Sequence, residues 1–246
     1  NALYYNAVGR GDFAKLIMQI CVVGVWDTDH AADIDSYFPD VLAYLESIEP
    51  PVFPDEIDET ELESGAVVFT QHCSGCHGTY HSEPSKETYP NQLIAVEEVG
   101  TDPFLAKGYQ QNPGFLEWLQ SSWFTKGPQA ANFVGVDGYI APPLDGVWAT
   151  APYLHNGSVP NLEQLLNSQL RSSLWKRNFG SSTYDLETVG WPIESLTEDE
   201  YQSLAEDEKY AVYNTRMEGY SNGGHIYGDA LSDEERRSLI SYLKSL

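Results

Sequence analysis

The sequence predicts a mainly α-helical protein, and three kinds of observation lead to this fold class. Apolar residues recur at helical spacing in several segments. Three Ser or Thr residues are each followed by Glu three positions later, a pattern typical of helix N-termini. Strand-like alternation is sparse, and Gly and Pro are so frequent in residues 127–145 and 219–228 that long loops are expected there.

The first segment of the chain is expected to be helical and to end at a proline-rich break. Residues 13–23 form one apolar element, and residues 33–48 carry apolar side chains close to helical spacing. Three prolines in residues 49–54 then forbid continued helix and favour extended chain. We therefore predict a helical segment without a cofactor motif over residues 1–55, and a separate domain over residues 56–246.

Five helices are expected in this second part. The first begins at a capping box of Thr60 and Glu63 and leads to a sequence motif at residue 73. The other four have a proline, an Asn N-cap or a capping box at their start, and they are predicted at residues 113–123, 161–170, 197–217 and 232–246.

The motif is Cys73-Ser74-Gly75-Cys76-His77, which has the C-x-x-C-H pattern of a c-type haem attachment site. Two thiols one helical turn apart can each form a thioether to a haem vinyl group, and the histidine that follows then binds the iron as its proximal ligand. Chance would produce this pattern in roughly one of a thousand chains of this composition. We therefore predict one covalently bound haem c.

Two other interpretations of the motif are less favoured. A structural zinc site needs four Cys or His ligands, and the one remaining cysteine is Cys21, whose apolar neighbours suggest a small buried side chain. A redox-active C-x-x-C would follow a strand, whereas residues 60–72 have a helical pattern.

Composition limits the classes of partner. The 37 acidic and 13 basic side chains give a formal charge of −24, which argues against binding of nucleic acid and anionic lipid. A basic redox protein as partner or a saline exterior would suit this charge, and an acidic surface that only keeps the protein in solution is the alternative. The longest apolar stretch, residues 13–26, is too short to span a bilayer. Because haem c is attached outside the cytoplasmic membrane in most bacteria, we expect an exported protein, in the periplasm or outside the cell.

Residues 139–160, with the core sequence TAPYLHNG at 150–157, resemble a segment of the bacterial di-haem cytochrome c peroxidase superfamily, in the branch of the rubber oxygenase type. The resemblance covers about residues 56–246 and implies a cytochrome c-like haem domain without implying a substrate. In cytochromes c, a glycine and an aromatic residue on the first helix let the last helix cross it closely. Gly65 and Phe69 match that pattern.

The chain also departs from the superfamily. Members usually carry two haem domains, whereas this sequence has one C-x-x-C-H; the other domain has been lost or lies upstream of Asn1. In the peroxidases a methionine after this segment binds the electron-transfer haem, but residues 165–169 contain none. His225 and Met217 are the candidates for the sixth ligand, and an absent ligand is the third alternative.

We favour His225, because glycines on both sides let the backbone approach the haem and imidazole is a strong ligand for iron. The resemblance also places Tyr153, His155 and Asn156 beside the haem, where they could form hydrogen bonds with propionates or backbone. His72 and His81 lie near His77 in sequence but are expected on its own side of the haem.

Two functions follow from this pattern. A single haem with six ligands leaves no vacant iron position, so electron transfer by a bis-histidine haem c is favoured. The alternative is a haem enzyme of the peroxidase or oxygenase type, or the electron-feeding domain of a larger di-haem protein. Whether the chain is an enzyme therefore stays open at this point.

Overall fold

The computed structural model describes residues 9–10, 28–121, 132–133, 137–180 and 182–246. The chain forms two compact units, one of residues 1–49 with 105–140 and one of residues 50–104 with 141–246. This grouping differs from the predicted division at residue 55. The break does fall at the proline-rich segment, but a local pattern does not reveal that residues 105–140 pack with the N-terminal unit.

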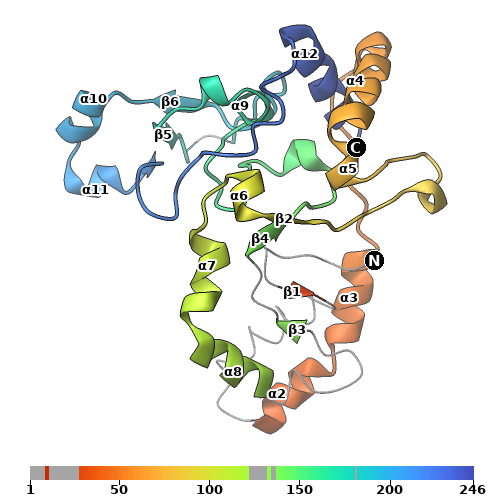
Figure 1. The fold of residues 1–246 in the computed structure, drawn as a ribbon, viewed down its shortest axis with the longest axis vertical. Coiled ribbons are helices and arrows are strands. Elements are labelled where there is room, and N and C mark those ends of the chain that lie inside the picture. The colour runs from red at the N-terminus through yellow and green to blue at the C-terminus, as the bar shows by residue number, and fades with distance from the viewer. Residues whose placement is uncertain (1–8, 11–27, 122–131, 134–136, 181) are drawn as a thin grey trace. The chain divides into compact units, whose positions relative to one another are not determined.

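The first unit contains short elements (Figure 1). The predicted helix over residues 33–48 is two helices that meet at residues 36–37. The predicted helix at 113–123 is present as α8, whereas residues 13–23 and Cys21 lie outside the described residues. The described elements of the first unit are α2 (Thr28–Asp35), α3 (Phe38–Glu46), most of α7 (Phe104–Gln111), α8 (Pro113–Ser121), β4 (Gly138–Ile140), and β1 (Gly9–Arg10) paired antiparallel with β3 (Asn132–Phe133).

The second unit is closed by its first and last helices, α4 (Glu59–His72) and α12 (Asp233–Leu243), which pack against each other (Figure 1). Gly65 lies at their crossing, where a Cβ would stand 1.9 Å from the carbonyl oxygen of Ser238. The rings of Phe69 and Tyr242 meet there with centres 5.0 Å apart. The predicted crossing of the end helices is therefore confirmed.

Side-chain caps define the starts of these helices. Ser232 and Glu235 form the predicted capping box of α12. The predicted box at Thr60 is wrong, because the side chain of Asp58 accepts hydrogen bonds from the backbone N–H groups of Thr60 and Glu61 and starts α4 earlier. A carboxylate two residues upstream provides a cap of the same chemistry.

Two predicted helices in the middle of the unit are shorter than expected. Asn161 caps α9 (Leu162–Leu166) as predicted, but the side chain of Asn167 then caps a separate turn, η5 (Ser168–Leu170). The prediction of one helix over residues 197–217 is wrong. The box at Thr197 is present, yet the segment forms α10 (Glu198–Ser203), α11 (Glu206–Lys209) and the strand β7 (Val212–Asn214).

The strand β7 exists because it joins a three-stranded antiparallel sheet in the order β6 (Ile193–Ser195), β5 (Leu174–Arg177), β7. Trp175 pairs with Tyr213 in the register, and their rings stack with centres 4.9 Å apart. Aromatic pairs across strands stabilise a sheet, so this long-range contact outweighs the local helical pattern.

Short elements and a buried core complete the unit. The short elements are α5 (Ser74–His77), η2 (Pro84–Lys86), β2 (Leu93–Ala95), α6 (Val96–Val99) and η4 (Val147–Ala149). No helix in the described ranges is long and apolar enough to cross a membrane. Helices predominate, as the mainly α class predicts, and the core contains Val68, Phe69, Tyr153, Val159, Leu162, Leu166, Val189, Leu231, Leu239 and Leu243.

Candidate haem site

The attachment motif forms one helical turn directly after α4. Cys73 ends α4, and its carbonyl oxygen accepts hydrogen bonds from the backbone N–H groups of Cys76 and His77 at 3.1 and 3.0 Å. Both thiols are free and partly buried. The turn therefore presents the two sulfurs and the imidazole together, as thioether attachment and iron ligation by neighbouring residues require.

The ring of His77 is oriented by a backbone acceptor. Its Nδ1 lies 2.9 Å from the carbonyl oxygen of Pro142, and because a carbonyl can only accept, Nδ1 carries the proton. Burial lowers the pKa of His77, although this hydrogen bond opposes the shift. The neutral ring thus keeps the lone pair of Nε2 available for a metal, which is the usual arrangement of a metal-binding histidine.

The structure brings His225 to face His77. The two ring centres are 6.2 Å apart and the ring planes are inclined at 64°. An imidazole nitrogen binds a metal at about 2 Å and lies about 1 Å from its ring centre, so two rings that share one metal have centres roughly 6 Å apart. The separation of the two rings therefore fits a single iron between them.

The electrostatic environment keeps the His225 imidazole neutral. Burial, followed by the charges of His77 and Arg171, lowers the pKa of His225 to about 4. Its Nδ1 is buried and has no hydrogen-bond partner among the described residues. The ring of Tyr227 packs edge-on against it, with centres 5.2 Å apart. A neutral, desolvated imidazole is a suitable iron ligand at neutral pH.

His225 belongs to residues 219–228, which we call the distal loop, and backbone contacts of this loop hold it in place. The N–H of His225 donates to the carbonyl oxygen of Val99 at 2.7 Å, and His225 itself has a φ of +47°. Gly224, with a φ of +72°, passes so close to Gly100 that a Cβ would lie 2.2 Å from its carbonyl carbon. Only glycine fits at that position, because both the conformation and the space exclude a side chain.

The three residues that were expected beside the haem have different surroundings. Tyr153 is buried, and its hydroxyl donates to the carbonyl oxygen of Val147 at 3.0 Å. His155 is half-buried; burial lowers its pKa, and the charge of Asp102 acts in the opposite direction. The Nδ2 of Asn156 donates to the carbonyl oxygens of Gly219 at 3.2 Å and Ser221 at 2.9 Å. Asn156 therefore supports the distal loop.

Met217, the other candidate ligand, lies at the surface, as do three further histidines. The side chain of Met217 is 51% exposed, and His72 and His81 are exposed as well. His30 is exposed in the other unit. Of the candidates for the sixth ligand, His225 is the one whose ring the structure brings to His77.

The thiols do not have the environment of a redox-active pair. Burial, and secondarily the neighbouring Cys76, raises the pKa of Cys73 to about 11, and burial also raises the pKa of Cys76. A reactive dithiol depends on a lowered pKa.

In the part of the chain that the structure describes, no group of three or more Cys, His, Asp or Glu side chains is placed to hold a metal ion.

The residues that position the two histidines could not be predicted from the sequence. Pro142 orients His77, Val99 binds the backbone of His225, and Arg171 donates hydrogen bonds to the distal loop. Pro142 lies inside the conspicuous segment 139–160, but its role depends on a carbonyl group, which every residue has. Arg171 stands in no motif, so nothing in its sequence neighbourhood marked it.

Comparison with known proteins supports the haem assignment. A family described as RoxA-like, cytochrome c-like matches residues 138–176, which include the segment that suggested the resemblance. Two proteins of Sinorhizobium fredii, both described as uncharacterized and called y4iM and y4iJ, are 27% and 25% identical over 83% and 81% of this chain. The chain spans 53% and 41% of their lengths.

The family match extends over part of the second unit and β4. A cytochrome c-like domain implies covalently bound haem c and a haem-based redox function. Residues Cys73, Cys76 and His77 provide the donor set that this cofactor needs. The predicted resemblance is therefore confirmed: residues 138–176 are similar to the RoxA-like, cytochrome c-like family, and this similarity supports a c-type cytochrome domain in this chain.

Proposed function

We propose that this domain transfers single electrons through one haem c that is attached to Cys73 and Cys76 and whose iron is bound by His77 and His225. The observation that carries the proposal is the 6.2 Å separation of the two imidazole rings. When bound, the haem supplies a one-electron couple at its iron. If His77 and His225 both hold the iron, no ligand position would be left for peroxide or oxygen.

The protein's own groups suit this task. Pro142 holds the proton of His77 at Nδ1, and the distal loop holds His225 through backbone contacts. Both rings are neutral at pH 7, because burial lowers both pKa values. Ligands held rigidly in this way change position little when the charge of the site changes, which favours rapid electron exchange.

Mutation of the two candidate ligands tests the ligation. In the haem-loaded protein, we expect a low-spin electron paramagnetic resonance spectrum that becomes high-spin in His225→Ala and stays unchanged in Met217→Ala. Met217 is the matched control because it was the competing candidate and is half exposed. A low-spin spectrum that survives His225→Ala, or is lost in Met217→Ala, contradicts the proposal.

The partner we propose is a basic redox protein, outside the cytoplasm. The formal charge of −24 produces a field that attracts a cationic partner and repels an anionic one. Electron transfer to a basic redox protein should therefore be slower at high ionic strength, as stopped-flow measurements at two salt concentrations can show. A rate that does not change with salt contradicts this part of the proposal.

A second candidate function is supported by the relatives. Because this chain spans only 53% and 41% of their lengths, the domain could supply electrons to another redox centre in a longer protein of that kind. The alternative in which this chain itself reacts with peroxide is tested by peroxide consumption. We expect none in the wild-type domain, and measurable turnover would favour the enzyme.

A further inference from the structure

Arg171 makes more contacts with the distal side of the site than any sequence pattern suggests. It follows η5, and its guanidinium donates five hydrogen bonds, all to backbone carbonyl oxygens. Two acceptors belong to α9 and three to the distal loop: Gln164 and Leu165 at 2.9 Å each, Asn222 and Gly224 at 2.7 Å each, and His225 at 3.2 Å.

Only arginine can make this set of contacts. A guanidinium has five N–H donors in a planar fork, and the number of hydrogen bonds here equals the number of donors. Lysine carries the same charge but has three donors on a single nitrogen. The side chain thus links α9 to three carbonyl groups of the distal loop, of which the last is that of His225.

The two histidines are oriented in different ways, which gives Arg171 its importance. The ring of His77 is held by its own hydrogen bond to Pro142. The Nδ1 of His225 has no such partner among the described residues, so its ring is aimed by the backbone. That backbone has a φ of +47°, which is uncommon for a residue other than glycine. The conformation therefore depends on the contacts of its N–H and C=O groups.

These contacts are the N–H of His225 with Val99 and its C=O with Arg171. Metal-binding histidines usually owe their orientation to a hydrogen bond of the second ring nitrogen. The His225 ring has no such bond, and the Arg171 guanidinium instead binds the backbone that carries the ring. Its acceptors there are the carbonyl oxygens of Asn222, Gly224 and His225.

We propose that Arg171 is a positioning residue that keeps the distal imidazole on the iron by fixing the backbone of residues 222–225. This inference rests on the proposed ligation of the iron by His225. Without the fork, the backbone of residues 222–225 would be less restrained, and His225 would leave the iron more often. Electron transfer then competes with binding of external ligands at that position.

The test uses the rate at which carbon monoxide binds to the reduced, haem-loaded protein, because carbon monoxide enters only when His225 leaves. In Arg171→Gln we expect this rate to rise at least about tenfold, since loss of one hydrogen bond from a charged donor changes an equilibrium by that factor. Carbon monoxide should also bind to Arg171→Lys faster than to the wild type, because lysine keeps the charge but lacks the planar fork of donors.

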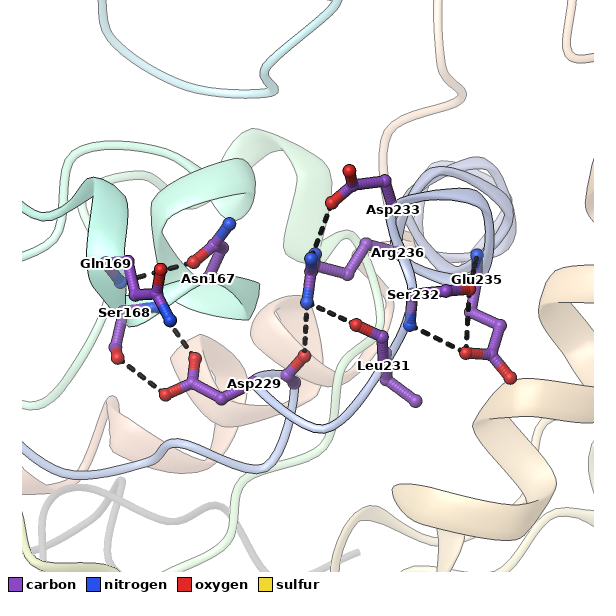
Figure 2. Close-up of polar contacts among 10 residues, drawn as sticks. Asn167, Ser168, Gln169, Asp229, Leu231, Ser232, Asp233, Glu235 and Arg236 are labelled. Atoms are coloured by element: carbon purple, nitrogen blue, oxygen red, sulfur yellow. Dashed lines mark hydrogen bonds and ion pairs between the residues drawn. The ribbon is translucent and has the colours of Figure 1, made fainter.

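Arg236→Gln is the matched control. The guanidinium of Arg236 also donates to backbone carbonyl oxygens, those of Gly228 at 3.0 Å and Leu231 at 2.5 Å, and Figure 2 shows the contact with Leu231. Its side chain is 16% exposed. Gly228 is the last residue of the distal loop and Leu231 lies beyond it, so neither contact holds residues 222–225, and this variant should bind carbon monoxide at the wild-type rate. An equal acceleration in Arg236→Gln would show general loosening of the fold and overturn the inference.

Other outcomes separate this inference from the proposed function. If His225→Ala leaves both the low-spin spectrum and the carbon monoxide rate unchanged, the proposed ligation is wrong. If His225→Ala changes both while Arg171→Gln behaves as wild type, the ligation stands and the role of Arg171 is refuted. Should Arg171→Gln fail to fold, Arg171→Lys carries the test, and a wild-type rate in that variant overturns the need for the fork.

Discussion

The two sides of the candidate haem site are built in opposite ways. On the proximal side, both thiols and His77 come from five consecutive residues on one turn of helix. On the distal side, His225 is held by contacts with Val99 and Arg171, which are distant in the sequence. The difference teaches that the attachment motif is encoded locally, whereas the position of the proposed sixth ligand depends on the assembled fold. Substitutions on the two sides should therefore have different effects on the protein.

Removing the thiols should have the largest effect. In a Cys73→Ala, Cys76→Ala double variant, we expect complete loss of covalently bound haem, because no sulfur is left in the motif to form a thioether. Haem staining after denaturing electrophoresis measures this. Cys21→Ala, which changes the third cysteine, should keep the haem. Covalent haem in the double variant would show that the motif is not the attachment site.

The helix crossing that supports the proximal side should be nearly as sensitive. In Gly65→Ala the new Cβ would lie 1.9 Å from the Ser238 carbonyl oxygen, so α4 and α12 must separate. We expect a loss of about 3 kcal/mol in the free energy of unfolding, measured with denaturant. Gly75→Ala is the control, since its Cβ would meet nothing within 4 Å. Equal stability of the two variants contradicts the close crossing.

On the distal side, Gly224→Ala should displace His225 without releasing the haem. The new Cβ would clash with the backbone of Gly100 at 2.2 Å and would favour a different φ. We expect a high-spin spectrum with full haem staining, and about 1–3 kcal/mol of lost stability. Gly223→Ala, whose nearest contact would be 3.3 Å from Ser221, should remain low-spin. Loss of haem staining in Gly224→Ala would contradict the proposal that haem attachment does not depend on the distal side.

The smallest expected effect concerns pH. Burial acts to raise the pKa of Asp229, but hydrogen bonds from Ser168 and the charges of Arg171 and Arg236 outweigh it, so the pKa is lowered. Figure 2 shows the two hydrogen bonds that Ser168 donates to this carboxylate. The stability that a lowered carboxyl pKa contributes is present above the ordinary value of about 4 and is lost as pH falls through the folded-state pKa.

Asp229→Asn should therefore destabilise the protein more at pH 7 than at pH 3. The difference should be under about 1 kcal/mol, because the carboxylate is largely exposed to solvent. Thermal unfolding of both proteins at the two pH values measures it. A larger loss at pH 3 would reverse the sign that the hydrogen bonds of Ser168 imply.

Local sequence signals predicted helix starts better than helix lengths. The capping boxes at Thr197 and Ser232 and the Asn161 cap are present, because each involves residues three positions apart. At Thr60 the start is off by two residues, since Asp58 provides the cap instead. The expected length of the helix after Thr197 was wrong, because Tyr213 stacks on Trp175 and its segment joins a sheet. A contact between residues so far apart leaves no trace in a local pattern.

The sequence by itself determined that this chain has the pattern of a haem attachment motif, and it predicted His77 as the proximal histidine. For the sixth ligand it left three alternatives: His225, Met217 or no ligand. Only the tertiary structure decided which of these faces His77, and it revealed Arg171, 54 residues from His225 in the chain. The physical reason is that thioether attachment uses consecutive residues, whereas the backbone of His225 is held by hydrogen bonds that form only when the chain has folded.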